Sequence, residues 1–92
     1  MSQLSSAEIE AFLTRSHGWS AQDSEIVKTF EFATYVDGLV FAVACGRLAE
    51  KRDHHPDMLI SWRKVRCSLS THSEGGITQK DLDLAAEIDG LI

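Results

Sequence analysis

The chain of 92 residues has only two cysteines, one proline and one tyrosine. Cys45 and Cys67 stand in neither a CxxC pair nor a metal-finger spacing, so we expect reduced, buried thiols and not a disulfide framework. The chain also lacks a signal-peptide pattern and any apolar run of about 18 residues, the length that spans a bilayer. We therefore expect a cytoplasmic protein.

Positive charge is also scarce. Nine Lys and Arg face fourteen Asp and Glu, which gives a net charge of -5 at pH 7. Nonspecific nucleic-acid binding needs a basic surface, so this balance argues against it. The hydrophobic content of 43% and charged content of 25% are typical of a globular protein. The length suits one domain, covering residues 1–92.

Capping signals predict a helix near each end of the chain. Ser5 and Glu8 have capping-box spacing, and Gly18 is a suitable stop for the helix that they begin. Near the other end, Thr78 is the predicted N-cap of a helix with Asp81 at its third position. Both terminal segments are therefore predicted to be helical.

The middle of the chain predicts four strands around a long helix. Trp19 begins a short strand, "SAQD" is the turn after it, and "SEIVKTFEFA" is the second strand. "DMLISW" and "KVRCSLSTH" are two more, the latter with apolar residues alternating as on a sheet with one exposed face. Between the pairs, a helix of about 18 residues should end near Asp53.

These elements predict an α+β fold of order αββαββα, with three helices on one face of a four-stranded, mainly antiparallel sheet. No charged residue occurs between Asp37 and Arg47, so the central helix is too apolar to have a single covered face. One face should pack on the sheet. The other suggests a subunit interface.

The segment His54-His55-Pro56 lies where the long helix should end and the third strand begin. Proline cannot continue the helix and extends the residue before it, and neighbouring side chains in an extended segment point to opposite sides. If the last two strands form a hairpin, His72 at the end of the second returns close to this segment. Asp81, at the start of the last helix, could reach the same end of the sheet.

Three histidines and a carboxylate suit three different sites. Imidazoles titrate near neutral pH, which favours acid–base catalysis. Three histidines also resemble a zinc site, although adjacent ligands on opposite sides of a strand argue against one shared metal. A solvated polar loop is the third interpretation, and the residue types alone leave all three open.

The spacing of these residues resembles the pterin-4a-carbinolamine dehydratase (4a-hydroxytetrahydrobiopterin dehydratase) family. Glu50 is followed after three residues by His54-His55-Pro56, and after five more by Trp62. Nine residues separate Trp62 from His72, and eight separate His72 from Asp81. The segments "EKRDHHP", "KVRCSLSTH" and "ITQKD" also resemble the family, and the likeness extends over about three quarters of the chain.

The resemblance implies a reaction and a site. Family members remove water from a 4a-hydroxytetrahydropterin to give a quinonoid dihydropterin, in tetrahydropterin recycling, with no metal or organic cofactor. The implied catalytic residues are His54, His55, His72 and Asp81, with Asp81 orienting a histidine. We expect His54 and His72 to form the acid–base pair. The implied substrate-binding residues are Asp53, His54, His55, Trp62, Ser70, Thr71, His72 and Ser73.

The resemblance also implies partners. Family members form homodimers or homotetramers and serve aromatic amino acid hydroxylases. An animal member doubles as a dimerisation cofactor for a homeodomain transcription factor, and diverged relatives act as assembly factors, so a binding protein is the main alternative to an enzyme. A three-histidine metalloenzyme is the other. Neither nucleic acid nor a membrane is an expected partner.

Overall fold

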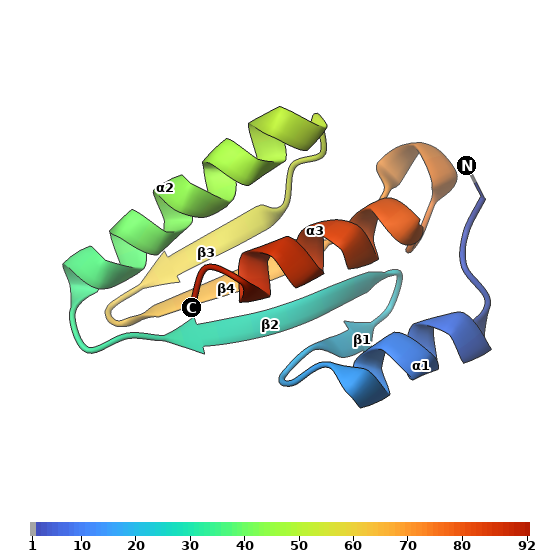
Figure 1. Cartoon of the computed structure of the whole chain (residues 1–92), viewed down its shortest axis with the longest axis horizontal. Coiled ribbons are helices and arrows are strands. Elements are labelled where there is room, and N and C mark those ends of the chain that lie inside the picture. The colour runs from blue at the N-terminus through green and yellow to red at the C-terminus, as the bar shows by residue number, and fades with distance from the viewer. Residues whose placement is uncertain (1) are drawn as a thin grey trace.

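A computed structural model describes residues 2–92, which form one four-stranded sheet with helices on one face (Figure 1). The helices are α1 (Ser6–Arg15), α2 (Tyr35–Arg52) and α3 (Gln79–Asp89), with a short 3-10 helix η1 (His72–Glu74). The strands are β1 (Ser20–Gln22), β2 (Glu25–Glu31), β3 (Asp57–Ser61) and β4 (Lys64–Leu69). This confirms the predicted α+β class and element order, to which η1 is an addition.

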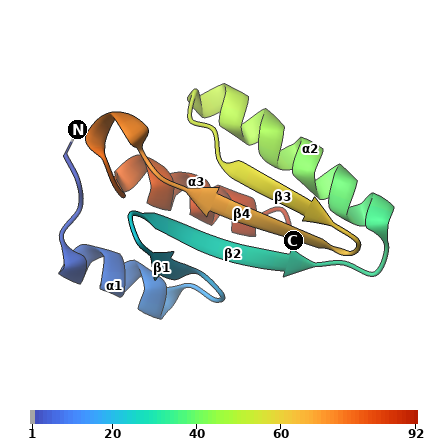
Figure 2. The same ribbon diagram turned by 180° about the vertical axis from the view of Figure 1, so that it is seen from behind.

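The strands are ordered β1-β2-β4-β3 and every neighbouring pair is antiparallel. The helix α2 connects β2 to β3 along the chain. In the sheet, β4 lies between these two strands, and β3 is therefore at one edge. Seen from behind, the strands lie in front of α3, and this face of the sheet has no helix over it (Figure 2). The sheet is therefore covered on one side only.

The core forms where the helices meet the covered face of the sheet. On β4 the predicted core residues Val65, Cys67 and Leu69 are completely buried, whereas Ser68, predicted to lie on an exposed face, is buried as well. Ile26 lies opposite Leu69 across the β2–β4 pair, and Phe30 lies opposite Val65. Buried side chains of the three helices complete the core: Phe12, Phe41, Cys45, Leu82, Leu84, Ala85 and Ile88. Each fully buried Leu or Ile stabilises the fold by roughly 1.5–3 kcal/mol.

The predicted capping box of α1 and the predicted N-cap of α3 are both present. The Ser5 hydroxyl accepts a hydrogen bond from the Glu8 N–H at 3.2 Å, and the Glu8 carboxylate accepts one from the Ser5 N–H at 2.9 Å. At α3, the Asp81 carboxylate accepts one from the Thr78 N–H at 2.9 Å. Such caps satisfy N–H groups that have no partner within the helix. The sequence therefore predicted both helix starts correctly.

Two predicted strand boundaries are wrong. "SAQD" is not a turn, because Ser20–Gln22 pairs with β2 as β1 and the chain reverses after Gln22, with Asp23 at a left-handed φ of 55°. A tight hairpin needs such a conformation, and aspartate tolerates it better than most residues. His72 does not end a strand either. The last strand stops at Leu69, and His72 begins η1.

The central helix has one covered face. It buries Phe41, Cys45 and Ala49 against the sheet, as predicted. Val36, Val40 and Val43 stay about 60% exposed along another side of the helix (62%, 63% and 59%). The predicted packing on the sheet is therefore confirmed, and the subunit interface stays a prediction.

The two cysteines are buried and free, as predicted. A hydrogen bond between their side chains, together with burial, raises the pKa of the Cys45 thiol well above its ordinary value. Among residues 2–92, no helix has both the length and the apolar character needed to cross a membrane.

Candidate functional site

The candidate site begins where α2 ends. Asp53 terminates the helix in a left-handed conformation (φ 49°, ψ 45°), and the His54 N–H still donates to the Ala49 carbonyl at 3.0 Å. For a residue other than glycine, this conformation costs about 1–2 kcal/mol of conformational free energy. The sharp stop sends His54, His55 and Pro56 into an extended segment that leads to β3.

The centre of the site is the carboxylate of Asp81, whose side chain is 0% exposed. Its Oδ1 lies 2.6 Å from His54 Nε2. Its Oδ2 accepts hydrogen bonds from the Thr71 hydroxyl at 2.8 Å and from the Thr78 N–H at 2.9 Å. A buried carboxylate is stable only when such partners replace water. The fold therefore holds the cap of α3, the end of β4 and His54 together through one side chain.

The hydroxyl of Thr78 orients the hydroxyl of Thr71. The Thr71 and Thr78 hydroxyl oxygens are 2.7 Å apart. Since a hydroxyl has one hydrogen and Thr71 donates its own to Asp81, the Thr78 hydroxyl donates to Thr71. The role of Thr71 as a buried bridge was missed, because it depends on the bridge between Thr71 and Gly76. Nothing in the sequence marks that contact.

The Asp81 contact decides which nitrogen of His54 is available. A carboxylate accepts hydrogen bonds, so Nε2 carries a proton and donates it to Oδ1. In the neutral ring Nδ1 is then a base, and in the charged ring it carries the second, transferable proton. The His54 side chain is only 11% exposed, so packing restricts the ring as well. This confirms that the last helix brings Asp81 to a histidine.

The adjacent histidine takes a different direction. His55 Nε2 lies 2.6 Å from Glu50 Oε2 in the last turn of α2, and both side chains are exposed. The prediction that the two neighbours serve different purposes is therefore in line with their contacts. Glu50, the first residue of the spacing motif, is a partner of His55.

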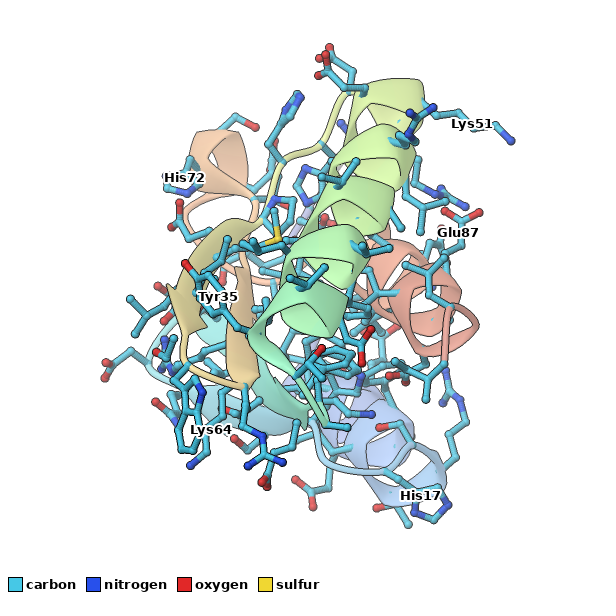
Figure 3. All side chains as sticks on the ribbon, turned by 90° about the vertical axis from the view of Figure 1, so that its left-hand side faces the viewer. His17, Tyr35, Lys51, Lys64, His72 and Glu87 are labelled. Carbon is cyan, nitrogen blue, oxygen red and sulfur yellow. The ribbon has the colours of Figure 1, made fainter. Side chains whose placement is uncertain are left out.

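His72 begins η1 directly after the buried Thr71. Its side chain is exposed, and Figure 3 shows it at the end of the sheet opposite to Lys64. The link from Thr71 through Asp81 to His54 holds η1 at the end of the molecule where α2 stops and α3 starts (Figure 1). The structure thus brings His72, His54 and Asp81 to one end of the sheet, as predicted.

The other predicted binding residues lie in different places. Asp53 and Ser73 are exposed at the histidine end. The Ser70 hydroxyl instead donates a hydrogen bond to the Ser24 carbonyl at 2.9 Å, beside the turn between β1 and β2. Trp62 lies in the β3–β4 turn, 74% exposed, at the far end of the hairpin from His54 and His72. Within one chain the structure does not bring Trp62 to the histidines.

The geometry also bears on metals and cavities. Among residues 2–92, no three His, Cys, Asp or Glu side chains gather closely enough to hold a metal ion. Three hollows of about 710, 460 and 420 Å³ lie elsewhere, and none is lined by His54, His55 or His72.

Comparisons with known proteins agree with this geometry. The family model described as pterin 4 alpha carbinolamine dehydratase matches residues 2–91. A protein of Natronomonas pharaonis with that name, given provisionally, is 51% identical over 89 residues, covering 97% of this chain and 95% of its own. A protein of Mycobacterium avium with the same provisional name is 40% identical over 92 residues, covering 100% of this chain and 98% of its own.

Two solved structures share the fold. The "transcriptional coactivator/pterin dehydratase from Brucella Melitensis" superposes with a TM-score of 0.92 at 30% identity, covering 97% of each chain. A "pterin dehydratase-like protein", described as a RuBisCO assembly factor in the alpha-carboxysome, has a TM-score of 0.67 at 24% identity, covering 82% of this chain and 89% of its own. The second likeness shows the fold alone.

Proposed function

Since the chain belongs to the pterin 4 alpha carbinolamine dehydratase family, we propose that it removes water from a 4a-hydroxytetrahydropterin and releases a quinonoid dihydropterin. The observation that carries this proposal is the buried Asp81 bound to His54, at the end of the sheet where His72 also lies. The same geometry supports His54 and His72 as the acid–base pair. It supports His55, held by Glu50, as a binding or auxiliary group.

The proposed dehydration is balanced by two proton transfers. One imidazolium donates a proton to the hydroxyl on C4a, the C–O bond breaks, and water leaves. A neutral imidazole accepts the proton of the neighbouring ring nitrogen, and the electron pair of that N–H bond forms the new C=N bond. Histidine side chains suit these tasks because an imidazole can act either as a proton donor or as a proton acceptor. In this proposal neither a metal nor an organic cofactor takes part.

The experiment is a stopped-flow assay of carbinolamine dehydration. Loss of one acid or base typically lowers a rate 10²- to 10⁴-fold, so His54→Ala and His72→Ala should each lower kcat by roughly that factor. His17→Ala is the matched control, since His17 lies in the exposed segment after α1, at the opposite end of the molecule from His72 (Figure 3). If both variants keep the full rate, the assignment of the acid–base pair is wrong.

The setting of this activity is also part of the proposal. An aromatic amino acid hydroxylase that consumes a tetrahydropterin would supply the carbinolamine, and the cytoplasm would be its compartment. We expect a homodimer or homotetramer, because the exposed valines 36, 40 and 43 of α2 form an apolar stripe suited to another subunit. Light scattering that finds only a monomer of 10.2 kDa would contradict the oligomer.

Protein binding is the second candidate function, and the apolar stripe of α2 favours it too. The Brucella relative, at 30% identity, has "transcriptional coactivator" in its description. The two functions can be distinguished in a host strain whose growth depends on the protein. If protein binding is the required function, the His72→Ala variant should restore growth. If dehydration is the required function, the His72→Ala variant should not restore growth.

A further inference from the structure

His72 lies in a short loop between β4 and α3, residues 71–76, which we call the His72 loop. The loop is closed at its base, where Thr71 and Gly76 pair as an antiparallel bridge and the Thr71 N–H donates to the Gly76 carbonyl at 2.9 Å. At the tip, His72 and Gly75 are exposed, and the backbone hydrogen bonds of η1 stay within the loop. The tip therefore depends on contacts from another part of the chain for a fixed position.

The N-terminal segment supplies such contacts. Figures 1 and 2 show this segment beside the loop that precedes α3. Gln3 Nε2 donates to the Glu74 carbonyl at 2.7 Å, across a separation of 71 positions in the chain. The Leu4 N–H donates to the Ile77 carbonyl at 2.9 Å, just after the loop. Residues 3–4 therefore hold the tip of the loop and the segment that leaves it.

The N-terminal segment is itself anchored. Leu4 is partly buried and packs against the core. Ser5, the next residue, forms the capping box of α1 with Glu8. A side chain on an ordered segment loses less backbone freedom when it forms a hydrogen bond than one on a free end. The contact from Gln3 to the loop therefore starts from a fixed point of the fold.

We propose that residues 3–4 form an N-terminal strap over the His72 loop, and that Gln3 is a positioning residue for His72. The role of His72 in this inference rests on the proposed function. The strap itself follows from the contacts of Gln3 and Leu4 alone. Gln3 acts by restricting the loop that carries the imidazole, and not by contact with the pterin.

Gly76 makes room for the strap. A Cβ at this position would lie 2.8 Å from Gln3 Oε1 and 2.9 Å from Gln3 Cδ, closer than a side chain allows. Gly75 has a left-handed φ of 71°, which favours glycine, whereas Gly76 is not among the residues with a positive φ. The contact with Gln3 therefore explains this glycine better than backbone conformation does. Because the far end of the Gln3 side chain is flexible, Gly76→Ala should displace Gln3 and leave the fold intact.

Hydrogen exchange measured by NMR tests the strap without any substrate. Amide exchange reports how often a segment opens, and the loss of one hydrogen bond shifts such an equilibrium roughly 2- to 13-fold. Gln3→Ala should therefore speed exchange of the Glu74 and Gly75 amides by that factor. Gln79→Ala is the matched control, because Gln79 is an exposed glutamine whose side chain donates to Asp83 within α3. Unchanged exchange in Gln3→Ala, or equal acceleration by Gln79→Ala, overturns the strap.

A double-mutant cycle tests the contact between Gln3 and Gly76. Gly76→Ala should speed exchange of the loop amides as Gln3→Ala does, because it displaces the same side chain. The double variant should show no further acceleration, since two substitutions that remove one contact are not additive. Gly46→Ala is the control, because a Cβ at Gly46 meets nothing within 4 Å. Additive effects in the double variant overturn the proposed contact.

Kinetics test the effect on His72. Gln3→Ala should lower kcat roughly 2- to 13-fold, because only the held loop presents His72 to the pterin. In the His72→Ala background, the same substitution should leave kcat unchanged, since the side chain that it positions is missing. A strap with a purely structural role would either lower kcat in both backgrounds or lower it in neither. Each of these two results overturns the positioning role.

Failure of the strap and failure of the proposed function can be told apart. If wild type does not dehydrate the carbinolamine, the proposed function fails, and hydrogen exchange still decides whether Gln3 holds the loop. Wild type and Gln3→Ala are then compared by equilibrium dialysis with a tetrahydropterin. Weaker binding by Gln3→Ala supports the positioning of His72 as a binding group, and equal binding overturns it.

Discussion

At the scale of single residues, Asp81 combines a structural and a chemical task. Its carboxylate caps α3, accepts from the Thr71 hydroxyl and holds His54, and it does so fully buried. Because all three contacts converge on one side chain, the position of His54 is coupled to the folding of α3. Asp81 does not need to touch the substrate, so we regard it as a positioning residue.

Asp81→Asn separates the two tasks. The amide can keep the cap, but an N–H₂ group facing His54 Nε2 favours the tautomer in which Nδ1 carries the proton. We expect kcat to fall roughly 10²- to 10⁴-fold, as when other catalytic histidines lose their orienting carboxylate. Nitrogen NMR of His54 should report the changed tautomer.

The Asp81→Ala variant is the comparison. It also leaves Thr71 and the Thr78 N–H without their acceptor, and should destabilise the fold by about 2–4 kcal/mol. Denaturant unfolding measures this difference. A fully active Asp81→Asn with the wild-type tautomer would show that Asp81 is only a cap.

The sequence predicted His54, Asp81 and their meeting place because capping and proline rules fix where α3 begins and where α2 ends. The contact between Thr71 and Asp81 was not predictable, because it forms only when η1 folds back on β4. The remoteness of Trp62 follows from the predicted hairpin, because Trp62 ends the first strand beside the turn whereas His72 comes after the far end of the second.

At the scale of elements, the end of α2 must stay fixed because the histidine segment follows it directly. Arg52 in its last turn forms a salt bridge with Glu87 of α3. The length of α2 was well predicted, since Thr34 caps one end and Pro56 follows the other. "SAQD" was misjudged because its polar residues suit a turn, although pairing with β2 makes the first three a strand.

The Arg52–Glu87 pair predicts a pH dependence of stability. The hydrogen bond from Arg52 lowers the pKa of the Glu87 carboxyl below its ordinary value. A depressed folded-state pKa means that the pair stabilises the fold above the unfolded pKa, near 4.3, and that this contribution is lost as the pH falls through the lower, folded value. Glu87→Gln should therefore have a free energy of unfolding that falls less steeply with decreasing pH than that of wild type, and the two should converge below the folded-state pKa of Glu87.

Urea unfolding between pH 3 and 7 measures this effect, with Glu10→Gln on α1 as the control. High salt should shrink the difference between wild type and Glu87→Gln, because both groups are partly exposed to solvent. If the free energy of unfolding of Glu87→Gln falls at low pH as steeply as that of wild type, the Arg52–Glu87 pair adds nothing to stability.

At the scale of the whole molecule, the chain has two different apolar surfaces. One is the β3 edge with Leu59, and the other is the valine stripe of α2. Two distinct symmetric interfaces on one chain generate a tetramer with two kinds of contact. Either interface alone would give a dimer.

Charge substitutions should dissect this assembly. Leu59→Lys should leave a dimer joined through α2, Val40→Lys a dimer joined through β3, and the double variant a monomer of 10.2 kDa. Both side chains are more than half exposed, so the subunit itself should still fold. Light scattering gives the masses and circular dichroism checks the fold, with Thr29→Lys on β2 as the control. A Leu59→Lys variant with the mass of wild type would show that the β3 edge is not a subunit contact.

The buried thiols have a practical consequence for following this assembly. Cys45 and Cys67 are the only cysteines, and both are fully buried, so a maleimide does not reach either thiol in the folded subunit. The wild-type sequence can thus serve directly as a silent background for maleimide labelling. A single fluorophore attached at position 59 or 61 would report subunit exchange in real time by self-quenching, with no cysteine-free version to build first.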